Sequence, residues 1–156
     1  MCISVVLFSG EFWHVVASLA LAMVFGAIIG IERELSGKAA GLRTNILICM
    51  GAALFTVLSM MIAKETGSEP TRIISQIVSG VGFLGAGAII RDRGGIQGLT
   101  TAAGIWLVAS VGVACGSGHY VIAAIATVFA ALSLLVFHPV SKYFRKRSKY
   151  VDYDQD

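Results

Sequence analysis

Residues 44–63 read TNILICMGAALFTVLSMMIA, a run of twenty residues without a charged side chain. A helix rises 1.5 Å per residue, so a helix of this length spans about 30 Å, the hydrocarbon thickness of a bilayer. Four more uncharged runs of similar length occur at residues 13–30, 73–90, 99–115 and 120–138. All 21 charged residues lie outside the five runs. The pattern predicts an all-α, polytopic membrane helix bundle with five transmembrane helices.

The overall composition agrees with a membrane protein. Of the 156 residues, 56% are hydrophobic and 13% are charged, and the mean hydropathy is +0.83. An ordinary soluble domain carries about 25% charged residues, and a disordered chain has far less apolar material. We therefore expect residues 1–156 to form a single transmembrane domain that ends in a short basic cytoplasmic tail, residues 139–156.

The basic residues predict the orientation. Ten of the twelve Lys and Arg lie between the first and second runs, between the third and fourth runs, or in the tail. Basic residues accumulate on the cytoplasmic side of a membrane. This predicts an N-terminus outside and a C-terminus inside. The basic tail either only fixes the C-terminus inside or also contacts anionic membrane lipid.

Small residues are expected to bring the helices together, because close backbone approach drives helix association in lipid. The predicted packing residues are Gly26, Gly30, Gly80, Gly82, Gly85, Gly87 and Trp106. They either pack within one bundle, or a small-residue face of the first or fifth helix forms a homo-oligomer or binds another membrane protein. The G-x-G-x-x-G pattern at residues 80–85 lies inside an uncharged run, so we do not interpret it as a dinucleotide site.

Charged and hydroxyl side chains gather in the two predicted cytoplasmic loops. The candidate functional residues there are Glu32, Arg33, Glu34, Arg43, Thr44, Asp92, Thr100 and Thr101. They either fix the topology or form a surface that a partner or ligand contacts. Residues 91–95 are expected to form a tight turn. Thr44 or Asn45 is expected to cap the second helix, and Thr100 or Thr101 the fourth.

A magnesium site at these loops is an open alternative, because Mg²⁺ takes one or two carboxylates plus water. Its ligands would be Glu32, Glu34 and Asp92. No carboxylate or base lies at membrane depth, where ion-coupled transporters usually carry them, because the three histidines lie at the ends of the runs. No catalytic arrangement is evident. We therefore expect neither an enzyme nor a bound cofactor, and no nucleic-acid partner.

Four stretches resemble the MgtC/SapB family of bacterial membrane proteins. They are Gly-Ile-Glu-Arg-Glu at 30–34, Gly-Leu-Arg-Thr at 41–44, Gly-Phe-Leu-Gly-Ala-Gly-Ala-Ile at 82–89 and Gly-Leu-Thr-Thr-Ala-Ala-Gly-Ile-Trp at 98–106. Their order and spacing extend the resemblance over about residues 20–135. The chain is more similar to the short SapB-type branch that lacks a C-terminal soluble domain.

The resemblance implies a multi-pass protein of the bacterial inner membrane. It also implies a role in growth at low magnesium or under acid stress, through binding or modulating other membrane proteins. The alternative is a magnesium or cation permease with a path between the third and fourth helices. The matching motif positions are Glu32, Arg33, Arg43, Thr44, Gly82, Gly85, Thr100, Thr101 and Trp106.

Overall fold

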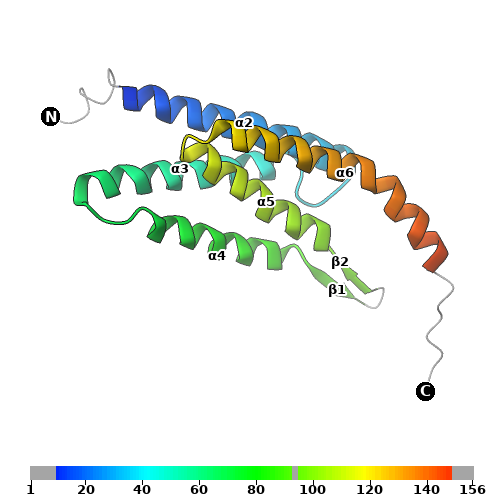
Figure 1. Ribbon diagram of the computed structural model, residues 1–156. Helices are drawn as coiled ribbons and strands as arrows, with labels where there is room; N and C mark the ends of the chain where they lie inside the picture. Colours follow the sequence, from blue (N-terminus) through cyan, green and yellow to red (C-terminus); the bar gives the residue numbers. More distant parts are fainter. Residues whose placement is uncertain (1–9, 93–94, 149–156) are drawn as a thin grey trace.

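In the part of the chain that the structure describes, five helices and one small hairpin make up the fold. The computed structural model describes residues 10–92 and 95–148 (Figure 1). In chain order the elements are α2 (Gly10–Leu35), α3 (Leu42–Thr66), α4 (Thr71–Gly87), β1 (Ile90–Asp92), β2 (Gly95–Gln97), α5 (Leu99–Gly116) and α6 (Tyr120–Ser148). This order confirms the predicted helical bundle. The orientation across the membrane stays a prediction.

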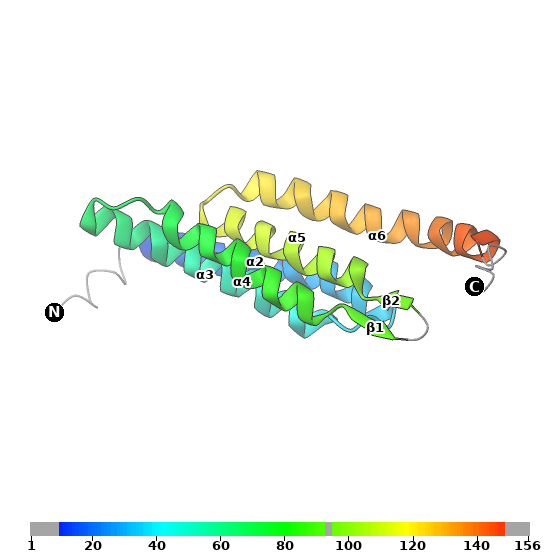
Figure 2. The same cartoon turned by 90° about the horizontal axis from the view of Figure 1, so that it is seen from below.

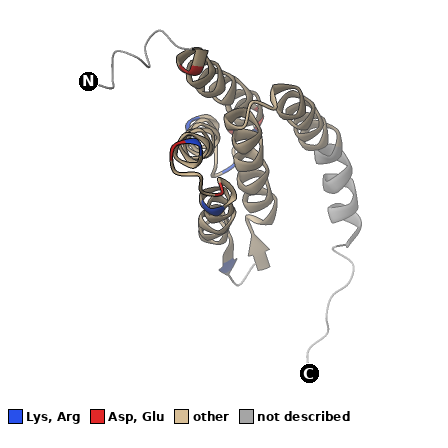
Figure 3. Cartoon of the chain, turned by 60° about the vertical axis from the view of Figure 1, so that its left-hand side comes forward, with Lys and Arg blue, Asp and Glu red and all other residues tan. Residues whose placement is uncertain are grey.

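The helices differ in how well they suit a bilayer. By length and composition, α2, α3 and α5 are long and apolar enough to cross a membrane. The apolar part of α6 is described over Tyr120–Val136. α4 has 17 residues, and its sequence mixes Ser, Gln and Gly with the apolar residues. Figure 3 shows that the charged residues of the described chain lie at helix ends and in connecting segments.

The ends of several helices differ from the prediction. α2 continues to Leu35, so Glu32, Arg33 and Glu34 lie on the last turn of a helix rather than in a loop. α6 continues to Ser148, beyond the predicted end at His138. Proline removes one intrahelical hydrogen bond, which bends or weakens a helix but does not always end it. The first part of the predicted tail, up to Ser148, is therefore helical.

The predicted turn at residues 91–95 belongs to a short antiparallel hairpin. Ile90 pairs with Gln97, Arg91 with Ile96 and Asp92 with Gly95. The pairing ends the third helix at Gly87 rather than at the predicted Ile90. β-branched isoleucines favour extended backbone, and Gly98 has a φ of 88° that suits glycine at the entry to α5.

The core lies where α2, α3, α5 and α6 meet. Its buried hydrophobic residues are small or β-branched, and the central cluster is Ala22, Ile29, Cys49, Ala53, Val108, Val111, Cys115, Ala123 and Ala130. α4 packs on α3 and α5, while α6 packs on α2 and α5. Figures 1 and 2 show α4 and α6 at different edges of the bundle.

Close helix contacts depend on four glycines. An added Cβ at Gly30 would lie 2.8 Å from the Cα of Leu42, and one at Gly26 would lie 2.9 Å from the backbone oxygen of Asn45. On α5, Gly112 and Gly116 meet the α3 backbone in the same way. These contacts hold α2 and α5 against α3.

The predicted packing residues on α4 and α5 behave differently. An added Cβ at Gly80, Gly82 or Gly87 would meet no atom within 4 Å. At Gly85 it would touch Ala102 at an ordinary 3.6 Å, and Trp106 is 52% exposed. Within the described chain, the three open glycines thus lack the helix neighbour that the sequence predicted, because α4 lies at the edge of the bundle.

Candidate functional site

One end of the bundle collects the predicted site residues. The C-terminal end of α2, the segment 36–41, the N-terminal ends of α3 and α5, and the β1–β2 hairpin all lie together there (Figures 1 and 2). We call this region the hairpin end. The positive-inside pattern predicts that it faces the cytoplasm.

A buried ion pair lies at the hairpin end. Nε of Arg33 lies 2.5 Å from Oε2 of Glu32, and Nη2 of Arg33 donates to Oε1 at 3.0 Å. The hydroxyl of Ser36 donates to the same Oε1 at 2.8 Å. Glu32 and Arg33 are 8% and 3% exposed. Buried charges are stable only when paired and hydrogen-bonded, so these contacts fix the end of α2.

One nitrogen of the Arg33 guanidinium is left without a partner among the described residues. Its Nη1 is buried and has no hydrogen-bond partner in the part of the chain that the structure describes. A buried donor without an acceptor costs about 1–3 kcal/mol. Arg33 therefore has the chemical capacity to hold one further oxygen acceptor.

Two more side chains close the segment between α2 and α3. Oε2 of Glu34 accepts a hydrogen bond from the backbone N–H of Leu42 at 2.9 Å. Its carboxylate occupies the space where a side chain at Gly41 would begin. Nδ2 of Asn45 donates to the carbonyls of Ala40 and Gly41, both at 2.8 Å. The turn is therefore tied to both helices.

The predicted helix caps are wrong. α3 begins after Gly41 and α5 after Gly98, and neither cap residue makes a side-chain cap bond. Glu34 of the preceding helix takes over the capping of α3, because its carboxylate reaches an N–H that the helix itself leaves unpaired. Sequence reasoning missed this role, since capping patterns are read within the helix that they cap.

The remaining site residues are only partly brought together. Arg43, Thr44 and Thr100 are exposed at the hairpin end, and Thr101 is 6% exposed. Asp92 lies in β1, but its side chain is outside the described residues.

The predicted magnesium site stays a prediction, because the side chain of Asp92 lies outside the described residues. The carboxylate of Glu32 holds Arg33 and Ser36, and that of Glu34 holds Leu42. Among the described residues, no three His, Cys, Asp or Glu side chains form a metal-binding group.

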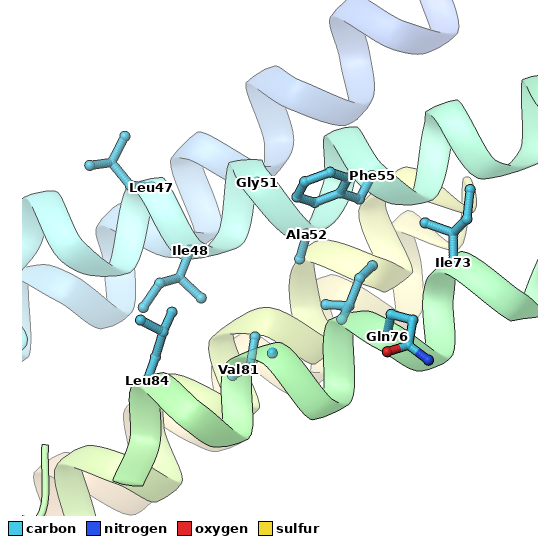
Figure 4. A pocket seen from close by; sticks show the side chains of 11 residues that line it. Leu47, Ile48, Gly51, Ala52, Phe55, Ile73, Gln76, Val81 and Leu84 are labelled. Atoms are coloured by element: carbon cyan, nitrogen blue, oxygen red, sulfur yellow. The ribbon is translucent and has the colours of Figure 1, made fainter. Parts of the chain in front are cut away.

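Two of the cavities in the described part of the chain lie between helices and have mostly apolar linings. The larger, about 500 Å³, lies between α3 and α4 (Figure 4). Its lining residues are Leu47, Ile48, Gly51, Ala52, Phe55, Ile73, Gln76, Ile77, Gly80, Val81 and Leu84. The smaller, about 150 Å³, lies between α4 and α5 beside Trp106. Neither lining includes a charged residue.

The opposite end of the bundle carries an exposed ion pair that sequence reasoning missed. Nζ of Lys64 donates to Oε1 of Glu11 at 2.5 Å, outside the predicted spans. This hydrogen bond and the attraction between the charges lower the pKa of Glu11 and raise that of Lys64. The partners are 53 residues apart, so no local pattern points to the pair.

The bundle of long apolar helices, with charge confined to its ends, defines a helical membrane protein. The MgtC family model matches residues 19–143. The chain belongs to the MgtC family.

Several curated relatives are similar to most of this chain. "Protein MgtC" of Brucella abortus (strain 2308) is 50% identical over 116 residues, which cover 74% of this chain and 48% of that protein. "Putative magnesium transporter YhiD" of Escherichia coli (strain K12) is 44% identical over 137 residues, 84% of this chain and 63% of that protein. "Protein MgtC" of Salmonella typhimurium (strain 14028s / SGSC 2262) is 47% identical over 113 residues, which cover 72% of this chain and 48% of that protein.

The chain spans about half the length of the MgtC proteins that it matches. No solved structure matches it.

Proposed function

We propose that this chain is a non-enzymatic protein of the bacterial inner membrane that supports growth at low magnesium or under acid stress by binding other membrane proteins. One observation carries the proposal. Polar and charged side chains gather at the hairpin end, whereas the linings of the cavities between α3 and α4 and between α4 and α5 contain no charged residue. Within the described residues, the molecule therefore presents a polar surface at one end, and these two cavities offer an ion no charged ligand.

The hairpin end suits a protein partner. Glu32, Arg33 and Asn45 are buried and hold the helix ends rigid, while Arg43, Thr44 and Thr100 are exposed around them. A rigid frame with exposed polar side chains loses little conformational entropy when it binds. We propose that the buried residues hold the helix ends in place and that the exposed residues contact the partner.

A magnesium permease is the second candidate, and the name of the E. coli relative, a putative magnesium transporter, favours it. The proposed path lies between α4 and α5. There the cavity lining includes the hydroxyl of Ser110, which donates to the carbonyl of Leu107 on its own helix. Mg²⁺ needs several oxygen ligands and gives up water reluctantly. An apolar lining supports the binding role over the permease.

Site-specific photo-crosslinking tests the binding role. A photoreactive amino acid is placed at Thr44 or Thr100, both exposed at the hairpin end, and at Ser68 as the exposed control near the opposite end. We expect a membrane protein to be captured from Thr44 and Thr100 in cells grown at low magnesium, and not from Ser68. Equal capture from all three positions contradicts the proposal.

The contact residue is tested separately. Arg43→Ala removes an exposed guanidinium whose side chain is not needed for the fold. We expect it to lower capture at Thr44 and growth at low magnesium in a strain without its own copy of the gene, while the amount of chain in the membrane stays unchanged. Full growth with Arg43→Ala overturns the assignment of partner contact to this end.

A further inference from the structure

The larger cavity, between α3 and α4, is an open groove, and it contains a polar side chain at membrane depth. The hydroxyl of Ser59 on α3 donates to the carbonyl of Pro70 at 2.5 Å. α4 therefore begins at the level of Ser59 on α3. Ser59 lies five residues before the charged Lys64, which is about 7.5 Å along the helix. Gln76 lies about 9 Å further along α4. It lines the groove together with Phe55, near the middle of α3 (Figure 4).

The amide of Gln76 is unpaired within the described part of the chain. Its side chain is exposed, and none of the described residues hydrogen-bonds to it. Hydrocarbon tails offer no donor or acceptor, so an amide that faces them pays a large desolvation cost. Polar side chains at this depth usually face protein rather than lipid. The groove is therefore expected to be covered by a partner that supplies a hydrogen bond.

The groove also has room for side chains of a second helix packed against it. Its volume is about 500 Å³, and an added Cβ at Gly51 or Gly80 would meet nothing within 4 Å. Glycines of this kind let the backbone of a second helix come close.

The outer face of α6 offers a comparison within the same chain, because a face that contacts lipid is expected to be apolar throughout. Its exposed side chains are large and apolar, namely Val121, Ile122, Ile125, Val128, Phe129, Leu132, Leu135 and Val136. On α4, by contrast, Gln76, Gly80, Phe83 and Gly87 follow the three- and four-residue spacing of one helix face, and all four are exposed. That face therefore carries one amide, two glycines that leave open space, and one protruding aromatic ring. The ring is Phe83, which is 81% exposed.

We propose that a second copy of this chain docks in the groove between α3 and α4, with the two Gln76 amides hydrogen-bonded to each other. Copies inserted in the same orientation are related by an axis along the membrane normal, so equivalent residues lie at equal depth. In such a dimer, Gln76 of one copy lies at the same depth as Gln76 of the other. An amide carries both donors and an acceptor, so two Gln76 side chains satisfy each other's hydrogen bonds. Phe83 of each copy packs over the gap at Gly80 or Gly87 of the other.

This interface replaces the two faces that the sequence favoured for an oligomer. Gly26 and Gly30 of α2 are buried against α3, and Ala123 and Ala130 of α6 are 0% and 4% exposed in the core. Those small residues are already used within one chain. The proposal goes beyond the proposed function, since it concerns self-association whatever else the chain binds.

The test counts copies of the purified full chain in lipid vesicles. Each chain carries one fluorophore at its C-terminus, and photobleaching steps give the dimer fraction over a range of protein-to-lipid ratios. We expect the wild type to become dimeric as the ratio rises. Gly80→Leu fills the groove and should raise the ratio needed for half dimerisation at least about tenfold, and Gln76→Leu should raise it about threefold to tenfold.

Gly82→Leu is the matched control. It makes the same change two residues away on α4, where an added Cβ also meets nothing within 4 Å, but Gly82 does not line the groove. It should dimerise as the wild type does, and Gln76→Asn should recover part of the loss. A wild type that stays monomeric at every ratio overturns the proposal and leaves lipid or a different protein in the groove. Dimerisation unchanged by both Gly80→Leu and Gln76→Leu overturns it as well.

Growth is not read in this experiment, so its outcome is independent of the binding role proposed for the hairpin end. Circular dichroism and elution as a single species show whether each variant is folded. If Gly80→Leu does not fold, Gln76→Leu alone decides, because it replaces an exposed side chain with one of similar size.

Discussion

The contact between α2 and α3 and the outer face of α4 both carry glycines at helical spacing, yet the two regions use them differently. At Gly26 and Gly30 the α3 backbone fills the space where a Cβ would be, whereas Gly80 and Gly87 have open space beside them. The first region is closed further by the buried groups of the hairpin end, and the second exposes an unpaired amide. Glycine spacing thus shows that a close approach is possible, but not whether the partner lies in the same chain.

The largest expected effect is at the buried ion pair. Arg33→Ala removes both N–H donors that hold the Glu32 carboxylate and is expected to lower the free energy of unfolding by about 3–5 kcal/mol. Arg43→Ala, at an exposed arginine ten residues along, should leave it within experimental scatter. Unfolding in mixed detergent micelles measures both. Equal losses in the two variants would mean that the closed region does not depend on its buried charges.

The glycines give the most direct comparison of the two regions. Gly30→Ala places a methyl group 2.8 Å from the Cα of Leu42 and should cost about 1–3 kcal/mol through overpacking. Gly80→Ala meets open space, so in monomeric micelles it should be neutral or stabilise α4 by up to about 1 kcal/mol. The same unfolding assay applies. A destabilising Gly80→Ala would place an unseen contact at the outer face of α4.

A smaller effect is expected at the start of α3. Glu34→Ala removes the acceptor for the N–H of Leu42 and should cost about 1 kcal/mol, as loss of a helix cap does. Thr44→Ala, three residues into the same turn, is the control, because Thr44 is exposed and does not cap the helix. Hydrogen exchange of the first amides of α3 should speed up in Glu34→Ala alone. Faster exchange in both variants would remove the capping role of Glu34.

The smallest effect lies outside both regions, at Glu11 and Lys64. The pKa of Glu11 is lowered by its hydrogen bond with Lys64 and by the attraction between them. The stability that this contributes is present above the unfolded-state pKa of Glu11 and is lost as the pH falls through the lower pKa of the folded state. The thermal midpoints of wild type and Glu11→Gln should differ slightly at about pH 7 and converge at about pH 3 or in high salt. A gap that persists at low pH would point to packing rather than charge.

The sequence predicted the five helices because charge is excluded from five runs of membrane length. It also named Glu32, Arg33 and Glu34, but it could not show that Arg33 pairs with its neighbour or that Glu34 caps the next helix. Those contacts depend on how far α2 extends, and the hydropathy pattern does not fix that point.

The groove was beyond sequence reasoning for a different reason. The sequence shows Gln76 as a polar residue within an apolar run. Which neighbours its side chain meets depends on how α4 is placed along α3, and the hydrogen bond from Ser59 to Pro70 sets that placement. The hairpin at residues 90–97 was missed because short strand pairs depend on register rather than on a repeating pattern.

Magnesium flux into vesicles that contain only this purified chain tests the central claim that it acts by binding rather than by transport. A known magnesium transporter in parallel vesicles shows that the assay works, and Gly85→Leu, which fills the contact between α4 and Ala102, is the matched variant. The account predicts no flux above that of empty vesicles for the wild type. Flux in the wild type that is lost in Gly85→Leu would contradict it and make the chain a permease.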